Sequence, residues 1–127
     1  MIVGTGVDII EIDRVRESHR RHGDRFLKRI FTESEMKYCL KKKDPYPSLA
    51  ARFAAKEAAV KAFADGFARG WKWTDLEVLR SAGGKPGLAF HGSFATAARK
   101  RKITDAHLTL SHSKRDAVAL VVLECRK

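Results

Sequence analysis

Two acidic residues of this 127-residue chain stand apart from its other carboxylates because of their surroundings. Asp8 lies in an apolar, β-branched stretch, and Glu57 lies in the middle of the alanine-rich segment ARFAAKEAAVKAFA. A carboxylate in an apolar strand is costly unless it is paired or bound to a cation. Two carboxylates that meet either share a proton or bind a hard cation such as Mg²⁺. Asp8 and Glu57 are therefore candidate metal ligands.

Three cations, Arg52, Lys56 and Lys61, flank Glu57 in the sequence. A metal ion beside lysine and arginine is a common means of holding a phosphoryl or pyrophosphoryl group. Each acid also has an ordinary structural interpretation. Asp8 could accept backbone hydrogen bonds, and Glu57 could simply pair with Lys61 one helical turn later. The pattern leaves both interpretations open.

Two shorter motifs could contact phosphate, but they are weak signals. The run Gly83–Gly87 could offer backbone amides and the Lys85 ammonium, although a plain hairpin turn is the simpler interpretation. His112, between Ser111 and Ser113, could also reach a phosphate, although isolated histidines are more often structural. Neither motif identifies a ligand unaided.

The segment Ala51–Ala64 is predicted to be the helix that organises the chain. At 3.6 residues per turn, its charged residues share about half of the circumference with Phe53 and Val60. The opposite half carries only alanine, whose small side chain lets another backbone approach closely. We therefore expect the alanine half to be packed and the charged half to line a site. The charged residues are Arg52, Lys56, Glu57 and Lys61.

The first stretch, Ile2–Ile10, reads as a buried strand in which Gly4 and Gly6 permit close backbone approach. If the central helix packs on this strand, Asp8 and Glu57 could meet. Helices are predicted over 13–22, 24–30 and 33–40, with Asp13 as the first cap and a capping box at residues 32–35. Strands are predicted over 76–80, 88–91, 107–113 and 117–124, with a short helix capped by Ser93.

This order of elements predicts an α+β fold in which a long central helix packs on a mostly antiparallel sheet. The length predicts a single domain, residues 1–127. A hydrophobic fraction of 44% and a charged fraction of 32% are typical of a soluble globular protein. We see no signal peptide and no apolar run near the ~20 residues of a membrane span. The two cysteines lack metal-type spacing, which favours free thiols in a reducing cytoplasm.

The net charge of +11 favours an anionic partner, without choosing between nucleic acid, phosphorylated ligand, membrane and acidic protein. Much of it lies in one basic segment, which could be a docking surface or merely a solvated face. The segment contains Arg14, Arg16, Arg20, Arg21, Arg25, Lys28 and Arg29, and Lys37, Lys41, Lys42 and Lys43 follow it.

Taken together, two motifs resemble the holo-[acyl-carrier-protein] synthases of the 4′-phosphopantetheinyl transferase superfamily. They are GxGVDI at residues 4–9 and RFAAKEA followed by KA at residues 52–62. The glycine and aspartate strand alone would be weak, whereas the helix motif is highly specific. Gly84-Lys85-Pro86 and Ser111-His112-Ser113 follow in the family's order, so the resemblance covers essentially the whole chain.

The resemblance implies transfer of 4′-phosphopantetheine from coenzyme A to a serine of apo-acyl carrier protein, in fatty acid biosynthesis. By this analogy Asp8 and Glu57 hold Mg²⁺, for which Mn²⁺ could substitute. Lys61 stabilises the transferred phosphoryl group, and Glu57 is the route for the serine proton. The analogy also makes a set of residues contacts of coenzyme A: Arg52, Lys56, Lys61, Gly84, Lys85, Pro86, His112 and Ser113.

The same resemblance implies a cytoplasmic homotrimer with sites between subunits. It also implies a use for the basic segment, in which Arg14 and Arg21 dock the acidic helix of acyl carrier protein. The chain departs from the family after Lys61, where Asp65 stands in a turn that the family tends to make glycine-rich. A carboxylate there would repel phosphate, so the ligand contacts of that turn are not predicted.

Two other classes of function compete with the enzyme. A nucleic-acid-binding module would explain the charge, but the chain has no zinc spacing, basic zipper or RNA-stacking signature, so we expect no nucleic-acid partner. A scaffold for an acidic partner would explain the charge without chemistry. Covalent modification of the carrier protein separates the enzyme from both.

Overall fold

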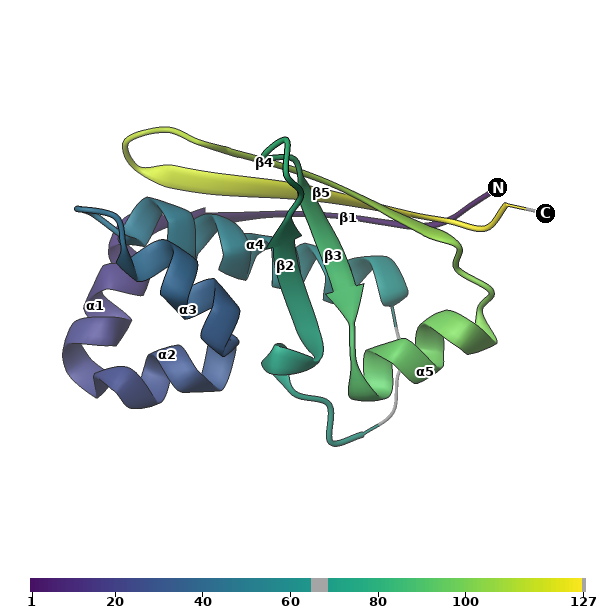
Figure 1. The fold of residues 1–127 in the computed structure, drawn as a ribbon, viewed down its shortest axis with the longest axis horizontal. Coiled ribbons are helices and arrows are strands. Elements are labelled where there is room, and N and C mark those ends of the chain that lie inside the picture. Colours follow the sequence, from purple (N-terminus) through teal and green to yellow (C-terminus); the bar gives the residue numbers. More distant parts are fainter. Residues whose placement is uncertain (65–68, 127) are drawn as a thin grey trace.

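A three-stranded antiparallel sheet forms one layer of the molecule, and a long helix packs against one of its faces (Figure 1). The computed structural model describes residues 1–64 and 69–126. The strand order is β1–β5–β4, so β1 and β4 are the two edge strands. The strands are β1 (Ile2–Glu11), β4 (Asp105–His112) and β5 (Asp116–Glu124), and the helix is α4 (Tyr46–Phe63).

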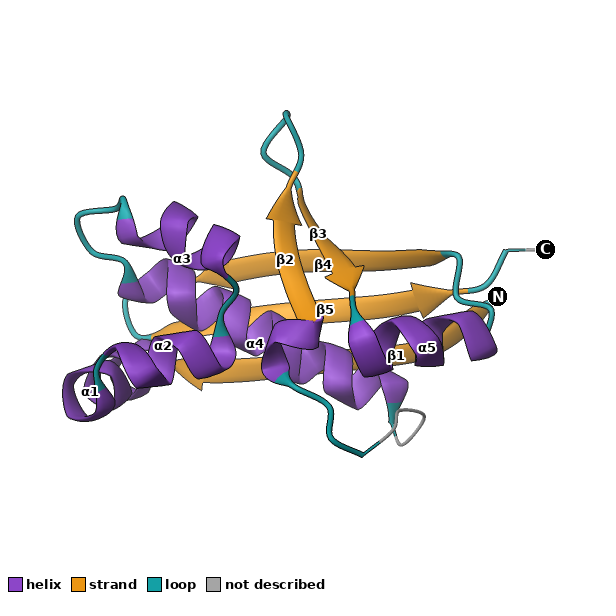
Figure 2. Cartoon of the chain, turned by 60° about the horizontal axis from the view of Figure 1, so that its bottom comes forward, coloured by secondary structure: helices purple, strands orange, loops and turns teal. Residues whose placement is uncertain are grey.

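The helices outside α4 lie on the side of α4 away from this sheet, so α4 forms the middle layer (Figures 1 and 2). Strands β2 and β3 pair as an antiparallel hairpin, whose turn extends past the β4 edge (Figure 2). The α+β prediction, with a long helix on an antiparallel sheet, is confirmed. These elements are α1 (Ile12–His22), α2 (Asp24–Ile30), α3 (Glu33–Leu40), the 3₁₀ helix η1 (Trp73–Asp75), β2 (Leu76–Arg80), β3 (Pro86–Phe90) and α5 (Gly92–Lys100).

Two glycines of β1 explain why α4 can lie directly on the strand. A Cβ added to Gly4 would stand 2.1 Å from the carbonyl oxygen of Ala62, and one added to Gly6 would stand 1.9 Å from that of Ala58. Because these are helix backbone atoms, no side-chain rotation can relieve the overlap. The next residue on the same face of β1 is Asp8, which is thereby brought against the helix.

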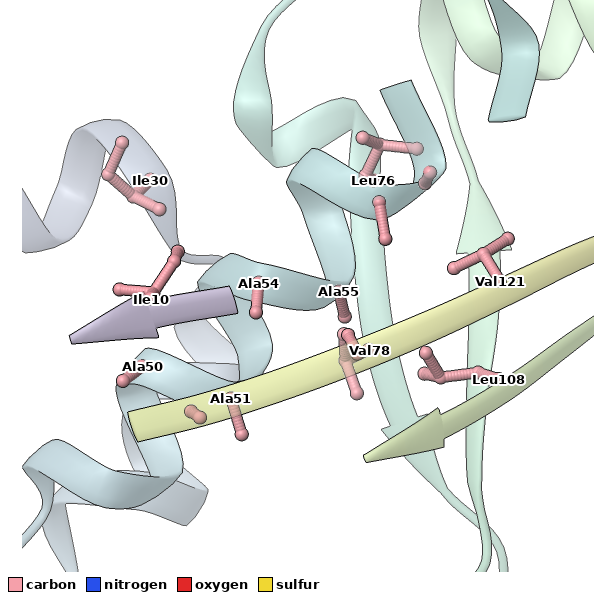
Figure 3. Close-up of a cluster of buried hydrophobic side chains, with 14 of the residues drawn as sticks. Ile10, Ile30, Ala50, Ala51, Ala54, Ala55, Leu76, Val78, Leu108 and Val121 are labelled. Atoms are coloured by element: carbon pink, nitrogen blue, oxygen red, sulfur yellow. The ribbon is translucent and has the colours of Figure 1, made fainter. Parts of the chain in front are cut away.

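The alanine half of α4 is buried, as predicted. Ala54, Ala55 and Ala58 are each 0% exposed. Figure 3 shows alanines of α4 among Val121 and Leu108 of the sheet and aliphatic side chains of other elements. The core therefore joins the sheet, the helix and the outer elements in one cluster.

The predicted helix ends differ in detail from the observed ones. Asp13 is not the cap of α1 but lies in its first turn, because the helix begins at Ile12 with Glu11 at the N-cap. Ser93 likewise lies inside α5, with His91 at the N-cap. The capping box of α3 is confirmed, with the Thr32 hydroxyl accepting from the Glu35 N–H. The predicted end of the central helix at Gly66 lies outside the described residues.

The face of the sheet away from α4 is apolar and open. Val7, Ile9 and Leu120 are 55%, 66% and 42% exposed, and their strand register places them on this same face. Within the described part of the chain, no helix combines the length and apolarity that crossing a membrane requires.

Candidate active site

Asp8, Glu57 and Lys61 meet where α4 crosses β1. The Lys61 ammonium donates to Asp8 Oδ1 at 2.9 Å and to the Val7 carbonyl oxygen at 3.0 Å. The glycine contacts place Asp8 at this crossing, and the i,i+4 spacing puts Glu57 and Lys61 on one face of the helix. The structure thus unites all three residues that were predicted to be catalytic.

The surroundings of the Glu57 carboxyl group strongly change its acidity. Burial, and after it the adjacent Asp8 carboxyl group, raises the pKa of Glu57 to about 7. The Lys61 and Arg14 charges oppose this shift but do not cancel it. Without a cation, Glu57 therefore carries a proton over part of the neutral pH range.

This arrangement fits a hard divalent cation. Asp8 Oδ2 is buried and receives no hydrogen bond from any described group, while Oδ1 is bound to Lys61. A cation would satisfy Oδ2 and remove the repulsion between the two carboxylates. Among the described residues no group of three or more His, Cys, Asp or Glu side chains could hold a metal. Water and substrate oxygens would have to complete the shell.

Lys56 does not belong to this site, which corrects the prediction that it contacts a ligand. Its side chain is 0% exposed, and its ammonium donates to Glu35 Oε1 and to the Ile30 carbonyl oxygen at 2.7 Å each. Glu35 also accepts from the Val78 N–H at 2.8 Å. Lys56 is thus held inside the molecule, where it ties α4 to α3 and β2, because this arc of the helix is covered by those elements.

A second predicted residue, Arg52, is 2% exposed and lines a pocket of about 310 Å³. His112, at the end of β4, lines the same pocket. Three further residues join them, namely Lys42, which the sequence offered only as part of the basic cluster, Ser48 and Arg80. The excess of positive charge suits the pocket to a phosphate.

The other predicted ligand contacts lie at nearby turns. Gly84 is held in the β2–β3 turn, where its carbonyl oxygen accepts from Arg80. Lys85 and Pro86 line a separate hollow against β4 and β5. The Ser113 hydroxyl accepts from backbone N–H groups in the β4–β5 turn, so it stabilises that turn.

The two groups of predicted residues lie apart within one chain. At about 100° per residue, Arg52 and Glu57 point about 140° apart around α4. Asp8 belongs to edge strand β1 and His112 to edge strand β4, with β5 between them. Two strand spacings alone correspond to roughly 9–10 Å. The carboxylate–lysine cluster and the cationic pocket are therefore separate half-sites on the two edges of the sheet.

The predicted docking residues lie on α1. Arg14 is exposed and close enough to Glu57 for its charge to lower the pKa of that carboxyl group. Arg21, seven residues later, falls on nearly the same helix face about 10 Å away. Its guanidinium lies 3.7 Å from Glu17, a solvated pairing that is easily exchanged. Asp65 lies outside the described residues.

The roles of three residues, Glu35, Arg80 and Lys42, could not be predicted from the sequence, for reasons that the structure makes clear. Glu35 was recognised only as part of a capping box, which explains its bond to Thr32 but not its pairing with Lys56. Arg80 ends a short strand, and Lys42 lies in a lysine run typical of solvated surface. No local pattern predicts that the two share a pocket with Arg52.

Together, the fold and these half-sites define an α+β protein with a carboxylate pair that could hold a cation and a cationic pocket that suits a phosphorylated ligand. Comparison with known proteins gives the family. The model of the 4′-phosphopantetheinyl transferase superfamily matches residues 4–120, so the chain belongs to that superfamily.

Named relatives are similar over nearly their whole length. A holo-[acyl-carrier-protein] synthase of Koribacter versatilis is 49% identical over 124 residues, covering 98% of this chain and 99% of the relative. A crystal structure of the Neisseria meningitidis synthase aligns with a TM-score of 0.88 at 30% identity, covering 98% and 99%. The Bacillus anthracis synthase, in complex with CoA (3′,5′-ADP), aligns at 0.80 with 38% identity, covering 99% of each chain.

Proposed function

We propose that this protein transfers the 4′-phosphopantetheine group of coenzyme A to a serine of apo-acyl carrier protein, in the cytoplasm and in support of fatty acid biosynthesis. The products are holo-acyl carrier protein and adenosine 3′,5′-bisphosphate. The observation that carries the proposal is the meeting of Asp8, Glu57 and Lys61 at the β1–α4 crossing, in a chain of this superfamily.

Asp8 and Glu57 would hold Mg²⁺, with Mn²⁺ as a substitute. When bound, the cation would neutralise charge on the pyrophosphate oxygens. Asp8 also orients Lys61 through the 2.9 Å hydrogen bond. An ammonium group has three hydrogens, so Lys61 keeps one for a phosphoryl oxygen, and its side chain is 57% exposed.

The reaction itself is a displacement at the β-phosphorus. The serine oxygen forms a bond to phosphorus, and the bond from phosphorus to the bridging oxygen breaks. That oxygen leaves on adenosine 3′,5′-bisphosphate. We assign acceptance of the serine proton to Glu57, whose carboxyl group lies beside Asp8 at this cluster. Lys61 offsets negative charge on the transferred group.

Coenzyme A would extend from this cluster to the cationic pocket. Its pyrophosphate belongs at the carboxylate–lysine cluster, and its 3′-phosphate belongs with Arg52 and His112. The backbone of Gly84 and the side chains of Lys85 and Pro86 would border the ligand, with Ser113 shaping the neighbouring turn. Lys56 is excluded from this set because its ammonium is committed to Glu35.

A homotrimer would bring the two half-sites together. One molecule of coenzyme A cannot readily span opposite edges of the sheet across α4, whereas the β1 edge of one subunit could meet the β4 edge of the next. The open apolar face with Val7, Ile9 and Leu120 supplies surface for such an assembly. Each site would then contain residues from two chains.

Acyl carrier protein would dock on α1, with Arg14 nearest the reacting groups and Arg21 about two turns away. Acidic partners are steered to such surfaces by long-range attraction, which salt weakens. Replacing Arg14 and Arg21 by glutamine should therefore slow carrier binding at low salt more than at high salt. Equal slowing at both would argue against this docking surface.

Mass spectrometry of apo-acyl carrier protein, incubated with coenzyme A, Mg²⁺ and the protein, tests the reaction directly. We expect the carrier to gain one phosphopantetheinyl group. Asp8→Asn is the most specific variant, because it keeps the shape of the side chain and removes the negative charge of the carboxylate that is proposed to hold the cation. The proposed function would be refuted if the carrier stays unmodified, while a known synthase modifies the same carrier in a parallel reaction.

A further inference from the structure

Arg52 is a buried guanidinium whose charge is not balanced by a carboxylate. It takes part in none of the ion pairs of the described residues, and its Nη1 donates to the Ser48 hydroxyl at 3.2 Å. The Arg52 Nε is buried and has no hydrogen-bond partner among the residues that the structure describes. What the guanidinium does contact is an aromatic ring, because its Cζ lies 4.4 Å from the ring centroid of Tyr38.

The same ring gathers two more cations. The Lys42 ammonium lies 5.0 Å from the Tyr38 centroid, and the Arg80 guanidinium carbon lies 5.3 Å from it. A cation within about 6 Å of an aromatic ring centroid and over its face is attracted by the ring quadrupole. Tyr38 therefore offsets part of the repulsion among three like charges.

These three cations are also the ones that line the pocket beside His112. Asp44 lines it too, but the Asp44 carboxylate is paired with Arg16 at 3.3 Å. The pocket is thus left with a positive excess that is held in place by one ring. Such a pocket suits a phosphomonoester, which carries about two negative charges near neutral pH.

We propose that Tyr38 is a positioning residue that sets the specificity for coenzyme A over its analogue without the 3′-phosphate. It acts by holding Lys42, Arg52 and Arg80 around the pocket. This inference rests on the proposed function, in which the pyrophosphate goes to the carboxylate–lysine cluster. The 3′-phosphate is then the one phosphomonoester of the substrate. The Tyr38 ring, rather than its hydroxyl group, holds these cations, because among the described residues no hydrogen bond involves the Tyr38 hydroxyl group.

Steady-state kinetics with coenzyme A and 3′-dephospho-coenzyme A test the inference. Tyr38→Leu removes the ring, and we expect KM for coenzyme A to rise about tenfold while KM for the dephospho form changes less than twofold. The effect falls on KM rather than on kcat. A tenfold change corresponds to about 1.4 kcal/mol, which lies between the values for exposed and for desolvated cation–π contacts. Tyr38→Phe keeps the ring and should keep the discrimination.

Two further variants compare a lysine that contacts the Tyr38 ring with a neighbouring lysine that does not line the pocket. Lys42→Met removes a cation that touches the ring and should lower the discrimination. Lys43→Met removes the next charge along the chain, which is exposed and does not line the pocket, and should leave the discrimination intact. If Tyr38→Leu lowers the melting temperature, Tyr38→Met can replace it, because methionine fills the same space with a flexible apolar side chain. We expect Tyr38→Met to raise KM for coenzyme A in the same way.

The inference is overturned if Tyr38→Leu, or Tyr38→Met in its place, impairs both substrates equally. It is also overturned if Tyr38→Phe loses the discrimination. A binding assay separates its failure from failure of the proposed function. Calorimetry with adenosine 3′,5′-bisphosphate and adenosine 5′-monophosphate needs no turnover. A preference for the bisphosphate that Tyr38→Leu abolishes supports the inference even if no carrier is modified, and equal binding by the unaltered protein refutes it.

Discussion

The contact between β1 and α4 makes a sharp prediction about Gly6. In Gly6→Ala, the new Cβ would lie 1.9 Å from the carbonyl oxygen of Ala58 and 3.0 Å from the Ala62 nitrogen. Strand and helix must separate by about 1.5 Å to reach the 3.4 Å at which ordinary contact begins. The clashing atoms belong to the helix backbone, so the whole interface must move.

We expect this variant to lose about 3 kcal/mol of unfolding free energy, the upper part of the usual range for overpacked cores. For a chain of this size that lowers the melting temperature by roughly 10 °C. The same shift carries Glu57 and Lys61 away from Asp8. Misplacement of reacting groups by about 1 Å can cost 10²-fold in rate, so activity should fall at least that far.

Urea denaturation and a carrier-modification assay at a temperature where the variant is folded measure the two effects. Gly87→Ala is the matched control, because a Cβ there meets no atom within 4 Å. Alanine in place of glycine often stabilises a compatible strand by about 0.4–1 kcal/mol through the unfolded state. A Gly6→Ala protein as stable and active as the Gly87→Ala protein would refute the reasoning.

Four further predictions concern the site and its surroundings. Because the pKa of Glu57 is raised to about 7, its native state binds more protons than the unfolded chain between about pH 4.5 and 7, so the cation-free protein should lose stability as pH rises through that window. Mg²⁺ affinity should rise with pH over the same window and level off above it, with proton release in calorimetry that Glu57→Gln abolishes. Lys56→Met should cost about 3–5 kcal/mol in urea denaturation by stranding the buried Glu35 charge, and adding Glu35→Gln should recover part of the loss; a cost below 1 kcal/mol would contradict the buried pair. Ile9→Glu should convert a trimer to folded monomers by light scattering and abolish transfer, whereas a monomeric unaltered protein that is active would contradict the shared site.

The glycines and alanines show how far local pattern reaches. Gly4 and Gly6 predicted that another backbone could approach β1 closely, and the alanine half of α4 predicted a close packing partner. The structure joins the two through the Ala58 and Ala62 carbonyls. Glycine and alanine leave room for a neighbouring backbone, so both predictions could be made before the packing partner was known.

The charged half of α4 shows where pattern fails. Helical spacing gives the direction of each side chain but not what covers it. Lys56 and Glu57 are consecutive, yet Lys56 is covered by α3 and β2 while Glu57 reaches the carboxylate–lysine cluster. The partner of Lys56, Glu35, is 21 positions away, and its capping box already accounted for its presence.

The sequence by itself determined the elements, the α+β order and the chemistry on offer: a carboxylate in an apolar strand, and a carboxylate and a lysine one turn apart on a helix. These follow from covalent spacing, which fixes side-chain directions within an element. The tertiary structure alone decided that Lys61 reaches Asp8 across 53 positions, that Lys56 turns inward, and that Tyr38 gathers three cations. Such contacts join distant segments, and their distances are set by how whole elements pack rather than by any spacing along the chain.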